Sequence, residues 1–242
     1  MNEVLLFTVI ACIGILVQSF AGFAGSLTAI PLFSLFLPPR EAIPAFNMVM
    51  LLVDAWLVFE ARRYIQWGRV GRLMVGAVAG IPIGAYGLKY LPTHVLGLII
   101  SIVTLIFAIL FLLKIRINLK ENAGTQMCVG LLSGFLGGSI SESGPPVVIY
   151  GLARDWDKNA FRTTLLTYFT CLCVLALLCY WQLGLLSGKS LSTFSAAIIP
   201  CFLAAIFGLV FKNRVGEATF RRAVLAVIIM VSLIGLIRSL WM

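Results

Sequence analysis

The chain has 242 residues, of which 61% are hydrophobic and only 11% are charged, and its mean hydropathy is +1.07. Apolar stretches of membrane-spanning length recur from end to end, which excludes a separate soluble domain and indicates an all-α polytopic membrane protein. The net charge of +9 does not indicate a nucleic-acid partner, because the basic residues lie in short loops between the spans, where they orient a chain in the membrane.

The predicted elements begin with a segment that is too long to be one membrane helix. Residues 4–37 would measure about 50 Å as a continuous helix, against a bilayer core of about 30 Å. Gly22 and Gly25 indicate that this segment bends back on itself. The ordinary spans predicted after it are 42–60, 73–91 and 95–113.

The second part of the chain repeats this plan. Residues 124–152 form another broken segment, and the spans predicted after it are 161–181, 191–211 and 223–240. A shift of 115 residues superimposes the two parts without a gap. The identical pairs are Leu16 and Leu131, Phe20 and Phe135, Gly22 and Gly137, Ser26 and Ser141, Pro31 and Pro146, Ala45 and Ala160, Phe46 and Phe161, Leu51 and Leu166, and Leu57 and Leu172. We interpret the chain as one transmembrane domain of two membrane repeats, 1–118 and 119–242.

The distribution of Lys and Arg predicts how the broken segments meet the membrane. Fourteen of the 18 basic residues lie in four regions, 61–72, 114–120, 153–162 and 212–222. The other four are Arg40, Lys89, Lys189 and Arg238. A complete crossing by 124–152 would place nine basic residues on each side, whereas a re-entrant hairpin gives a split of 14 to 4, which the positive-inside rule favours. If 4–37 is re-entrant too, each half crosses three times and the halves are inverted repeats.

The sequence GGSISESGPP, residues 137–146, predicts a polar site inside the membrane. Non-helical backbone is tolerated at that depth where it lines a cavity or is buried in protein. Ser143 is a candidate N-cap, and the prolines after it suit a first helical turn. A half-helix that begins there would offer free N–H groups and a positive dipole end to an anion. In the first repeat, AGFAGSLTAIP at 21–31 places Ser26 or Thr28 near the equivalent helix start.

Two such helix starts, entering from opposite faces, predict a binding site for a small oxyanion near the midplane. The alternative is that Gly and Ser only allow tight helix packing, which leaves Glu142 and the Pro-Pro pair without a purpose. The candidate substrate-binding residues lie in or beside the broken segments: Gln18, Ser19, Gly22, Ser26, Thr28, Asn47, Ser133, Gly137, Gly138, Ser139, Ser141, Ser143, Arg162 and Thr163.

Three charged residues lie within or beside apolar segments, where such groups usually have a function. We expect Arg162 to offset the charge of the anion, and Glu142 or Asp54 to carry a proton, since a carboxylate beside an anion repels it only when ionised. Arg162 could instead be a cytoplasmic residue that extends to the membrane surface, and Asp54 could form a structural hydrogen bond or ion pair.

Cofactor and enzyme chemistry have no support in the residue inventory. One histidine, His94, lies in a predicted loop, and the cysteines lie in apolar segments without CxxC spacing, where they suit packing: Cys12, Cys128, Cys171, Cys173, Cys179 and Cys201. We therefore expect no metal, no other cofactor and no catalytic site. The first residues lack a basic region and a cleavage site, so we expect no removable signal peptide.

The chain resembles the TauE/SafE sulfite exporter family, also described as the toluene sulfonate uptake permease family. The resemblance rests on the duplicated halves, on GFAGSLTAIP at 22–31 and GFLGGSISESGPP at 134–146, and on the G-x-P-x-G-x-x-G pattern from Gly80 to Gly87. It covers nearly the whole chain, although adjacent glycines occur only at 137–138 within these segments. Membership implies transport of a small sulfur oxyanion or organosulfonate, commonly export, across a prokaryotic cytoplasmic membrane.

These observations predict a multi-pass secondary transporter of the cell membrane that exports a small anion such as sulfite or a sulfonate. The chain has no GxxxxGK[ST] motif, so an ion gradient or the substrate gradient would drive it. The alternatives are an anion channel, an uptake permease for another small carboxylate or oxyanion, and a non-transporting membrane assembly protein. The expected partners are the anionic substrate and the lipid bilayer, with the oligomeric state open and a homodimer as one option.

Overall fold

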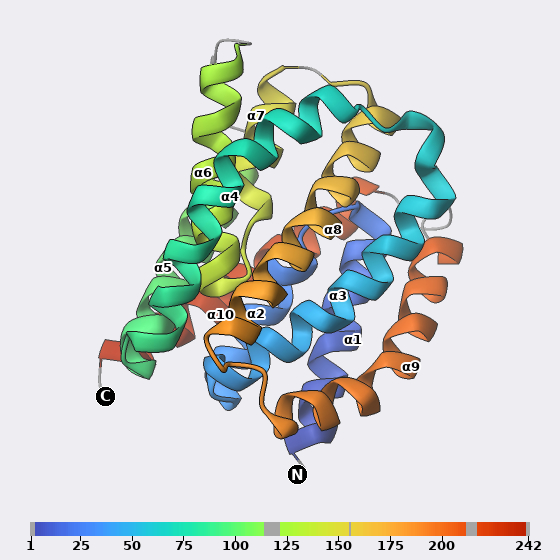
Figure 1. Ribbon diagram of the computed structural model, residues 1–242. Coiled ribbons are helices and arrows are strands. Elements are labelled where there is room, and N and C mark those ends of the chain that lie inside the picture. Colours follow the sequence, from blue (N-terminus) through green and yellow to red (C-terminus); the bar gives the residue numbers. More distant parts are fainter. Residues whose placement is uncertain (1–2, 114–121, 155, 212–216, 241–242) are drawn as a thin grey trace.

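The computed structural model describes residues 3–113, 122–154, 156–211 and 217–240 (Figure 1). Within these residues it contains ten α-helices, one 3₁₀-helix and no strand, which confirms the predicted all-α fold. The helices are α1 (Glu3–Ala21), α2 (Gly25–Phe36), α3 (Pro39–Ala61), η1 (Arg62–Tyr64), α4 (Trp67–Tyr90), α5 (Thr93–Leu112), α6 (Ala123–Ile140), α7 (Gly144–Ala153), α8 (Lys158–Gln182), α9 (Gly188–Phe211) and α10 (Glu217–Leu240). The element order is therefore a broken helix followed by three long helices, twice.

Six helices of the described chain are long and apolar enough to cross a membrane: α1, α3, α4, α5, α8 and α9. Five of them match spans predicted from the sequence, and the described apolar part of α10, Val224–Ser239, is shorter. The sixth, α1, was predicted as one arm of a re-entrant segment, yet its 19 residues and mean hydropathy of 2.4 suit a complete crossing. The protein is a multi-pass membrane protein.

Both broken segments fold back as antiparallel helical hairpins. In the first hairpin, α1 and α2, the chain turns at Gly22 and Ala24, whose φ angles are 79° and 74°. Phe7 of α1 stacks on Phe33 of α2, with ring centroids 4.8 Å apart, so α2 runs back along α1.

The second hairpin, α6 and α7, turns at Ser141, whose φ is 59°. The N–H groups of Ser141 and Glu142 donate to the carbonyls of Gly137 and Leu136, a pattern that closes the C-terminus of α6. Further along the arms, Gln126 Nε2 donates to Tyr150 Oη at 3.0 Å. Ala24 and Ser141 are the described non-glycine residues with positive φ, and each lies at the turn of one hairpin.

The two hairpins enter the bundle from opposite ends. At the end that we call the N-terminal end, Lys189 Nζ lies 2.9 Å from Glu3 Oε2 and 2.7 Å from Glu41 Oε2. At the far end, Arg72 Nε donates to Gln126 Oε1 at 2.6 Å. In Figure 1, α1 accordingly starts at the bottom, beside the N label, and α6 starts at the top.

The four basic residues outside the Lys- and Arg-rich regions gather at one end of the bundle. Arg40 donates to the carbonyls of Leu88 and Leu91, on either side of Lys89. Arg238 donates to the carbonyl of Leu35, and Lys189 pairs with Glu41. All four residues therefore lie at the N-terminal end. Residues 114–121 and 212–216, which carry several of the other basic residues, lie outside the described residues.

Each hairpin packs its long arm against a helix from the other half. α6 runs along α4, and α1 runs along α9, while α3 contacts α8 and α5 contacts α10. The α4–α6 contact requires glycine, because a Cβ at Gly80 would lie 2.2 Å from the carbonyl oxygen of Leu131 and one at Gly84 would lie 2.2 Å from that of Phe135. The glycines of the 80–87 pattern thus bring two helix backbones into contact.

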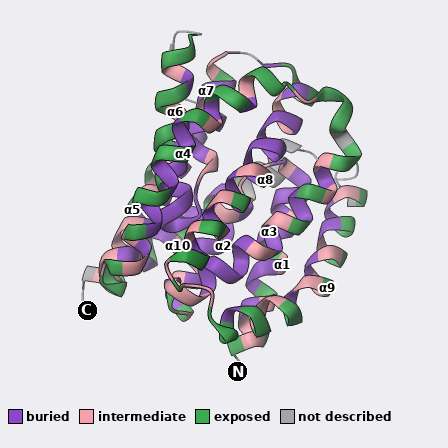
Figure 2. Ribbon diagram, viewed as in Figure 1, coloured by how far each residue is buried: buried purple, intermediate pink, exposed green. Residues whose placement is uncertain are grey.

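Buried residues gather between the helices, and exposed residues lie on the outer faces (Figure 2). Many of the exposed residues are large and apolar. Ile83 on α4, and Ile199 and Leu203 on α9, are 59%, 70% and 63% exposed. Such a surface is unfavourable in water and suits contact with lipid chains.

Candidate functional site

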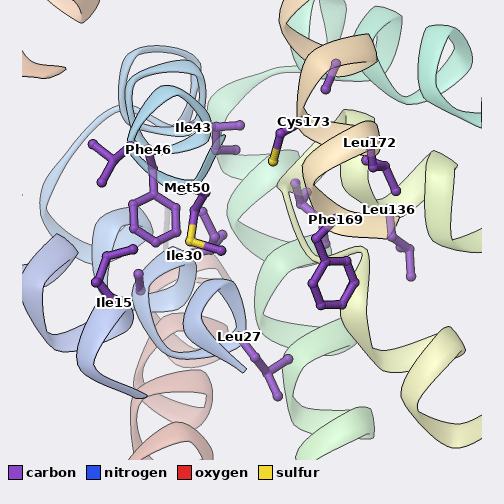
Figure 3. Close-up of a cluster of buried hydrophobic side chains, with 14 of the residues drawn as sticks. Ile15, Leu27, Ile30, Ile43, Phe46, Met50, Leu136, Phe169, Leu172 and Cys173 are labelled. Atoms are coloured by element: carbon purple, nitrogen blue, oxygen red, sulfur yellow. The ribbon is translucent and has the colours of Figure 1, made fainter. Parts of the chain in front are cut away.

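A small, partly open cavity lies between the turns of the two hairpins. Figure 3 shows Leu27 and Met50 near this region from the first hairpin and α3, and Phe169, Leu172 and Cys173 from α8. The residues that line the cavity are Gln18, Phe23, Ala24, Ser26, Leu27, Asn47, Met50, Phe111, Gly137, Ser141, Glu142, Ser143, Gly144, Pro145, Phe169, Leu172 and Cys173.

The first hairpin presents the start of α2 to this cavity. Gln18 Oε1 accepts a hydrogen bond from Gly25 N at 3.0 Å, and Thr28 N donates to the carbonyl of Ala24. The N–H groups of Ser26 and Leu27 lie between these two bonds and have no partner among the described residues. Unpaired amides and the positive end of the helix dipole make this a place that favours an anion.

The second hairpin presents Ser141 and the start of α7. Ser141 Oγ accepts a hydrogen bond from Asn47 Nδ2 at 2.8 Å, so its own hydrogen can point into the cavity. Ser143 takes the predicted N-cap position of α7, but its hydroxyl makes no capping bond. Pro145 and Pro146 have no N–H, so Gly144 supplies the amide of this first turn.

Glu142 contributes a carboxyl group with one unsatisfied oxygen. The residue has no solvent exposure, and its Oε1 accepts a hydrogen bond from Thr104 Oγ1 at 2.5 Å. Its Oε2 is buried and has no partner among the described residues, although the side chain lines the cavity. A buried oxygen of this kind requires a proton or a ligand beside it, because burial without a partner is costly.

Two tyrosines of α8 donate hydrogen bonds to the second hairpin. Tyr180 Oη donates to the carbonyl of Gly138 at 2.9 Å, and Tyr168 Oη donates to Ser133 Oγ at 2.9 Å. Ser133 Oγ in turn donates to the carbonyl of Ser143, which joins the two arms of the hairpin. Together with the bonds to Ser141 and Glu142, these contacts fix the second turn on several sides.

Arg162 lies beside the first hairpin and does not line the cavity. Its side chain packs against Gly22, since a Cβ added at Gly22 would lie 2.7 Å from Arg162 Cγ. Its Nη2 donates to the carbonyl of Ser19 at 3.2 Å. Ser19 belongs to the last turn of α1, where a cation interacts favourably with the helix dipole.

The structure brings seven of the sixteen candidate residues to the cavity: Gln18, Ser26, Asn47, Gly137, Ser141, Glu142 and Ser143. The other nine lie outside its lining: Ser19, Gly22, Thr28, Asp54, Ser133, Gly138, Ser139, Arg162 and Thr163. Among these, Thr28 donates to the carbonyl of Ala24 in the hairpin turn, Ser139 donates to a carbonyl of its own helix, and Asp54 accepts from Gln18. Thr163 is buried in α8, where its carbonyl accepts from Thr167.

Sequence reasoning missed the apolar side of the site and one polar residue. Phe23, Met50, Phe111 and Phe169 line the cavity but carry no pattern that separates them from other apolar residues. Thr104 had a usable signal, since a hydroxyl in an otherwise apolar span often bonds to another intramembrane polar group.

Two opposed hairpins around a small cavity with polar and apolar lining, in a bundle of apolar helices, define a multi-pass helical membrane protein with an internal site. The chain belongs to the sulfite exporter TauE/SafE family, whose family model matches residues 6–234. Membership identifies a membrane transporter of the sulfite-exporter type. Comparisons with curated proteins and with solved structures gave no match.

Proposed function

We propose that the protein is a secondary transporter that exports a small sulfur oxyanion or sulfonate, such as sulfite, across the cytoplasmic membrane. The observation that carries this proposal is the cavity between two hairpin turns, which combines unpaired N–H and O–H donors with the unpartnered Oε2 of Glu142. Family membership supports the sulfur anion as the substrate class.

The donors suit an oxyanion because they approach from two sides. The amides of Ser26 and Leu27 come from the first hairpin, and the hydroxyl of Ser141 and the amide of Gly144 come from the second. Both helix starts carry partial positive charge, so a singly or doubly charged anion is stabilised without a full cation in the lining. Arg162 adds a positive charge beside the first turn, from outside the cavity.

Glu142 couples the anion to a proton in this proposal. When ionised, its carboxylate would repel an anion in the cavity that it lines. When protonated, its Oε2 can donate a hydrogen bond to the anion, which supplies the partner that this oxygen lacks. Asp54 is the second candidate for proton coupling, but its carboxylate accepts from Gln18 Nε2 at 3.1 Å.

Alternating access would arise from movement of the two halves as inverted repeats around a fixed site. The reciprocal contacts of α6 with α4 and of α1 with α9, and the entry of the hairpins from opposite ends, support this arrangement. We place the far end of the bundle in the cytoplasm, because Arg72 of the Arg-rich region 61–72 bonds to Gln126 there and the positive-inside rule places such regions in the cytoplasm.

Reconstitution in liposomes tests this function. Sulfite efflux should saturate with sulfite concentration and should respond to an imposed proton gradient. Flux that rises linearly with concentration and ignores the proton gradient would identify an anion channel. Absence of sulfite flux, alongside flux of another small carboxylate or oxyanion, would replace the substrate class.

A further inference from the structure

In the first hairpin, the first amide of α2 already has a hydrogen-bond acceptor, which is a side chain of the protein. Gln18 Oε1 accepts from Gly25 N at 3.0 Å, and Gln18 Nε2 donates to the two carboxylate oxygens of Asp54 at 3.1 and 3.4 Å. An amide N–H needs an oxygen and a carboxylate needs an N–H, so one orientation of the Gln18 amide satisfies both neighbours. Gln18 and Asp54 are 1% and 0% exposed.

This hydrogen bond lies at the wall of the proposed anion site. Gln18 lines the cavity together with Ser26, the next residue of α2 after Gly25. Glu142, fully buried on the opposite hairpin, lines the same space with an oxygen that has no partner among the described residues. The first amide of α2, that of Gly25, lies just behind the cavity lining and donates to the uncharged side-chain oxygen of Gln18. The same cavity is lined by the unsatisfied carboxyl group of Glu142.

The two hairpins differ in this respect. At the start of α7, Ser143 stands at the N-cap position without a capping bond, so its first turn is open. At the start of α2, the cap comes from a side chain seven residues earlier, on the other arm of the hairpin. Gly25 allows this approach, because a Cβ there would lie 2.8 Å from Gln18 Cβ.

We propose that Gln18 is a displaceable cap on the start of α2, held in orientation by Asp54, and that a bound oxyanion replaces Gln18 Oε1 at Gly25 N. This inference rests on the proposed function and deepens it. A charged oxygen accepts a stronger hydrogen bond from an amide than a neutral carbonyl oxygen does, so the exchange favours the anion. Asp54 acts through Gln18 and is a positioning residue. The anion first meets the open second hairpin and then takes over the capped amide of the first.

The test is sulfite binding to purified protein by calorimetry, with Gln18 replaced by methionine, a residue of similar shape that accepts hydrogen bonds only weakly. Gln18→Met removes the internal competitor, so the Kd for sulfite should fall by about threefold to tenfold, the effect of one modest hydrogen bond. In liposomes KM should fall by a similar factor while kcat does not rise, because the ground state with bound anion is the state stabilised.

Gln18→Met also leaves the carboxylate of Asp54 without its donor, so a second pair of variants removes that complication. Asp54→Asn neutralises the buried charge, and Asp54→Asn with Gln18→Met should bind sulfite about threefold to tenfold more tightly than Asp54→Asn alone. The matched control is Gln126→Met, which alters a buried glutamine that bonds to Tyr150 and Arg72 away from the cavity and should leave the Kd unchanged.

The direction of the change decides between the roles open to Gln18. A Kd that stays constant or rises on Gln18→Met, in either background, overturns the displaceable cap and makes Gln18 a substrate ligand or a structural residue. If the double variant does not fold, Asp54→Asn alone decides. Without the charge of Asp54 the Gln18 cap is held less firmly, so sulfite should bind more tightly. An unchanged or weaker affinity for sulfite overturns the proposal. Wild-type protein that shows no saturable sulfite binding removes the proposed function and the cap together.

Discussion

At the scale of single residues, Glu142 is the group that we propose to couple transport to protons. Its Oε1 is held by Thr104 and its Oε2 has no partner among the described residues, so a change of charge at this carboxyl acts directly on the cavity. The sequence predicted Glu142 as a candidate because charge inside a membrane segment is rare. It could not predict that Thr104 is the partner, since the two residues lie 38 positions apart and meet only through packing.

Glu142→Gln tests the coupling. The glutamine keeps a group that can donate to the anion but can no longer gain or lose a proton, so binding should persist while the response to the proton gradient disappears. We expect gradient-driven sulfite flux to fall about tenfold, equal to about 1.4 kcal/mol, with little change in flux down a sulfite gradient alone. Initial rates in liposomes with and without a pH gradient measure this. A variant that keeps the wild-type response to the gradient contradicts the assignment.

Ser141 tests the anion donors separately from backbone strain. Ser141→Ala removes the hydroxyl at a φ of 59°, whereas Ser141→Gly removes it and relieves the strain of that conformation. Both should weaken sulfite binding by about tenfold, since a hydrogen bond to a charged group contributes about 1.5 kcal/mol. Calorimetry gives the Kd values, and Ser192→Ala, which alters an exposed hydroxyl bonded to the carbonyl of Lys189, is the control. A loss in the alanine variant that the glycine variant restores would assign the effect to conformation.

At the scale of helices, the sequence predicted both breaks and the approximate ends of the long helices. Gly22 and the 137–146 segment carry strong local signals, because glycine and proline interrupt helices whatever surrounds them. The partner of each helix could not be predicted in this way. Gly80 of α4 contacts α6, a helix from the other half of the chain. The sequence around Gly80 does not specify which helix packs against it.

Gly80→Ala tests the close contact between α4 and α6. Its new Cβ would lie 2.2 Å from the carbonyl oxygen of Leu131, so the two backbones must separate, and overpacking of this kind costs about 1–3 kcal/mol. Gly71→Ala, on the same helix and with nothing within 4 Å of its Cβ, should be neutral or slightly stabilising. Thermal unfolding in detergent compares the two. Equal melting temperatures would show that α4 and α6 do not approach this closely.

At the scale of the whole molecule, the charge pattern predicted that 124–152 is re-entrant, and the repeat extended this to 4–37, which together predicted hairpins that enter from opposite sides of the membrane. The described contacts of Arg40, Lys189 and Arg238 place the minority of basic residues together at the N-terminal end. The sequence could not predict the size of the cavity or its apolar wall, because side chains from both hairpins, α3, α5 and α8 create them jointly.

Labelling from outside the cell tests the orientation. Cysteine introduced at Lys189, at the N-terminal end, should react with an impermeant maleimide in intact cells, measured against the signal of the unchanged chain. Cysteine introduced at Tyr64, which is 54% exposed in η1, should react only after the membrane is opened. Equal labelling of both positions in intact cells would be inconsistent with a far end in the cytoplasm.

The unequal support of the two hairpins has a consequence for how such a carrier would work. Among the described residues, the α8 tyrosines, Asn47 and Thr104 hold the second turn, whereas Gln18, Thr28 and Arg162 supply the side-chain bonds at the first. The second turn can therefore serve as the fixed side of the site, and the less extensively bonded first turn as the side that moves. The two hairpins would then have different roles in transport, one holding the anion while the other releases it.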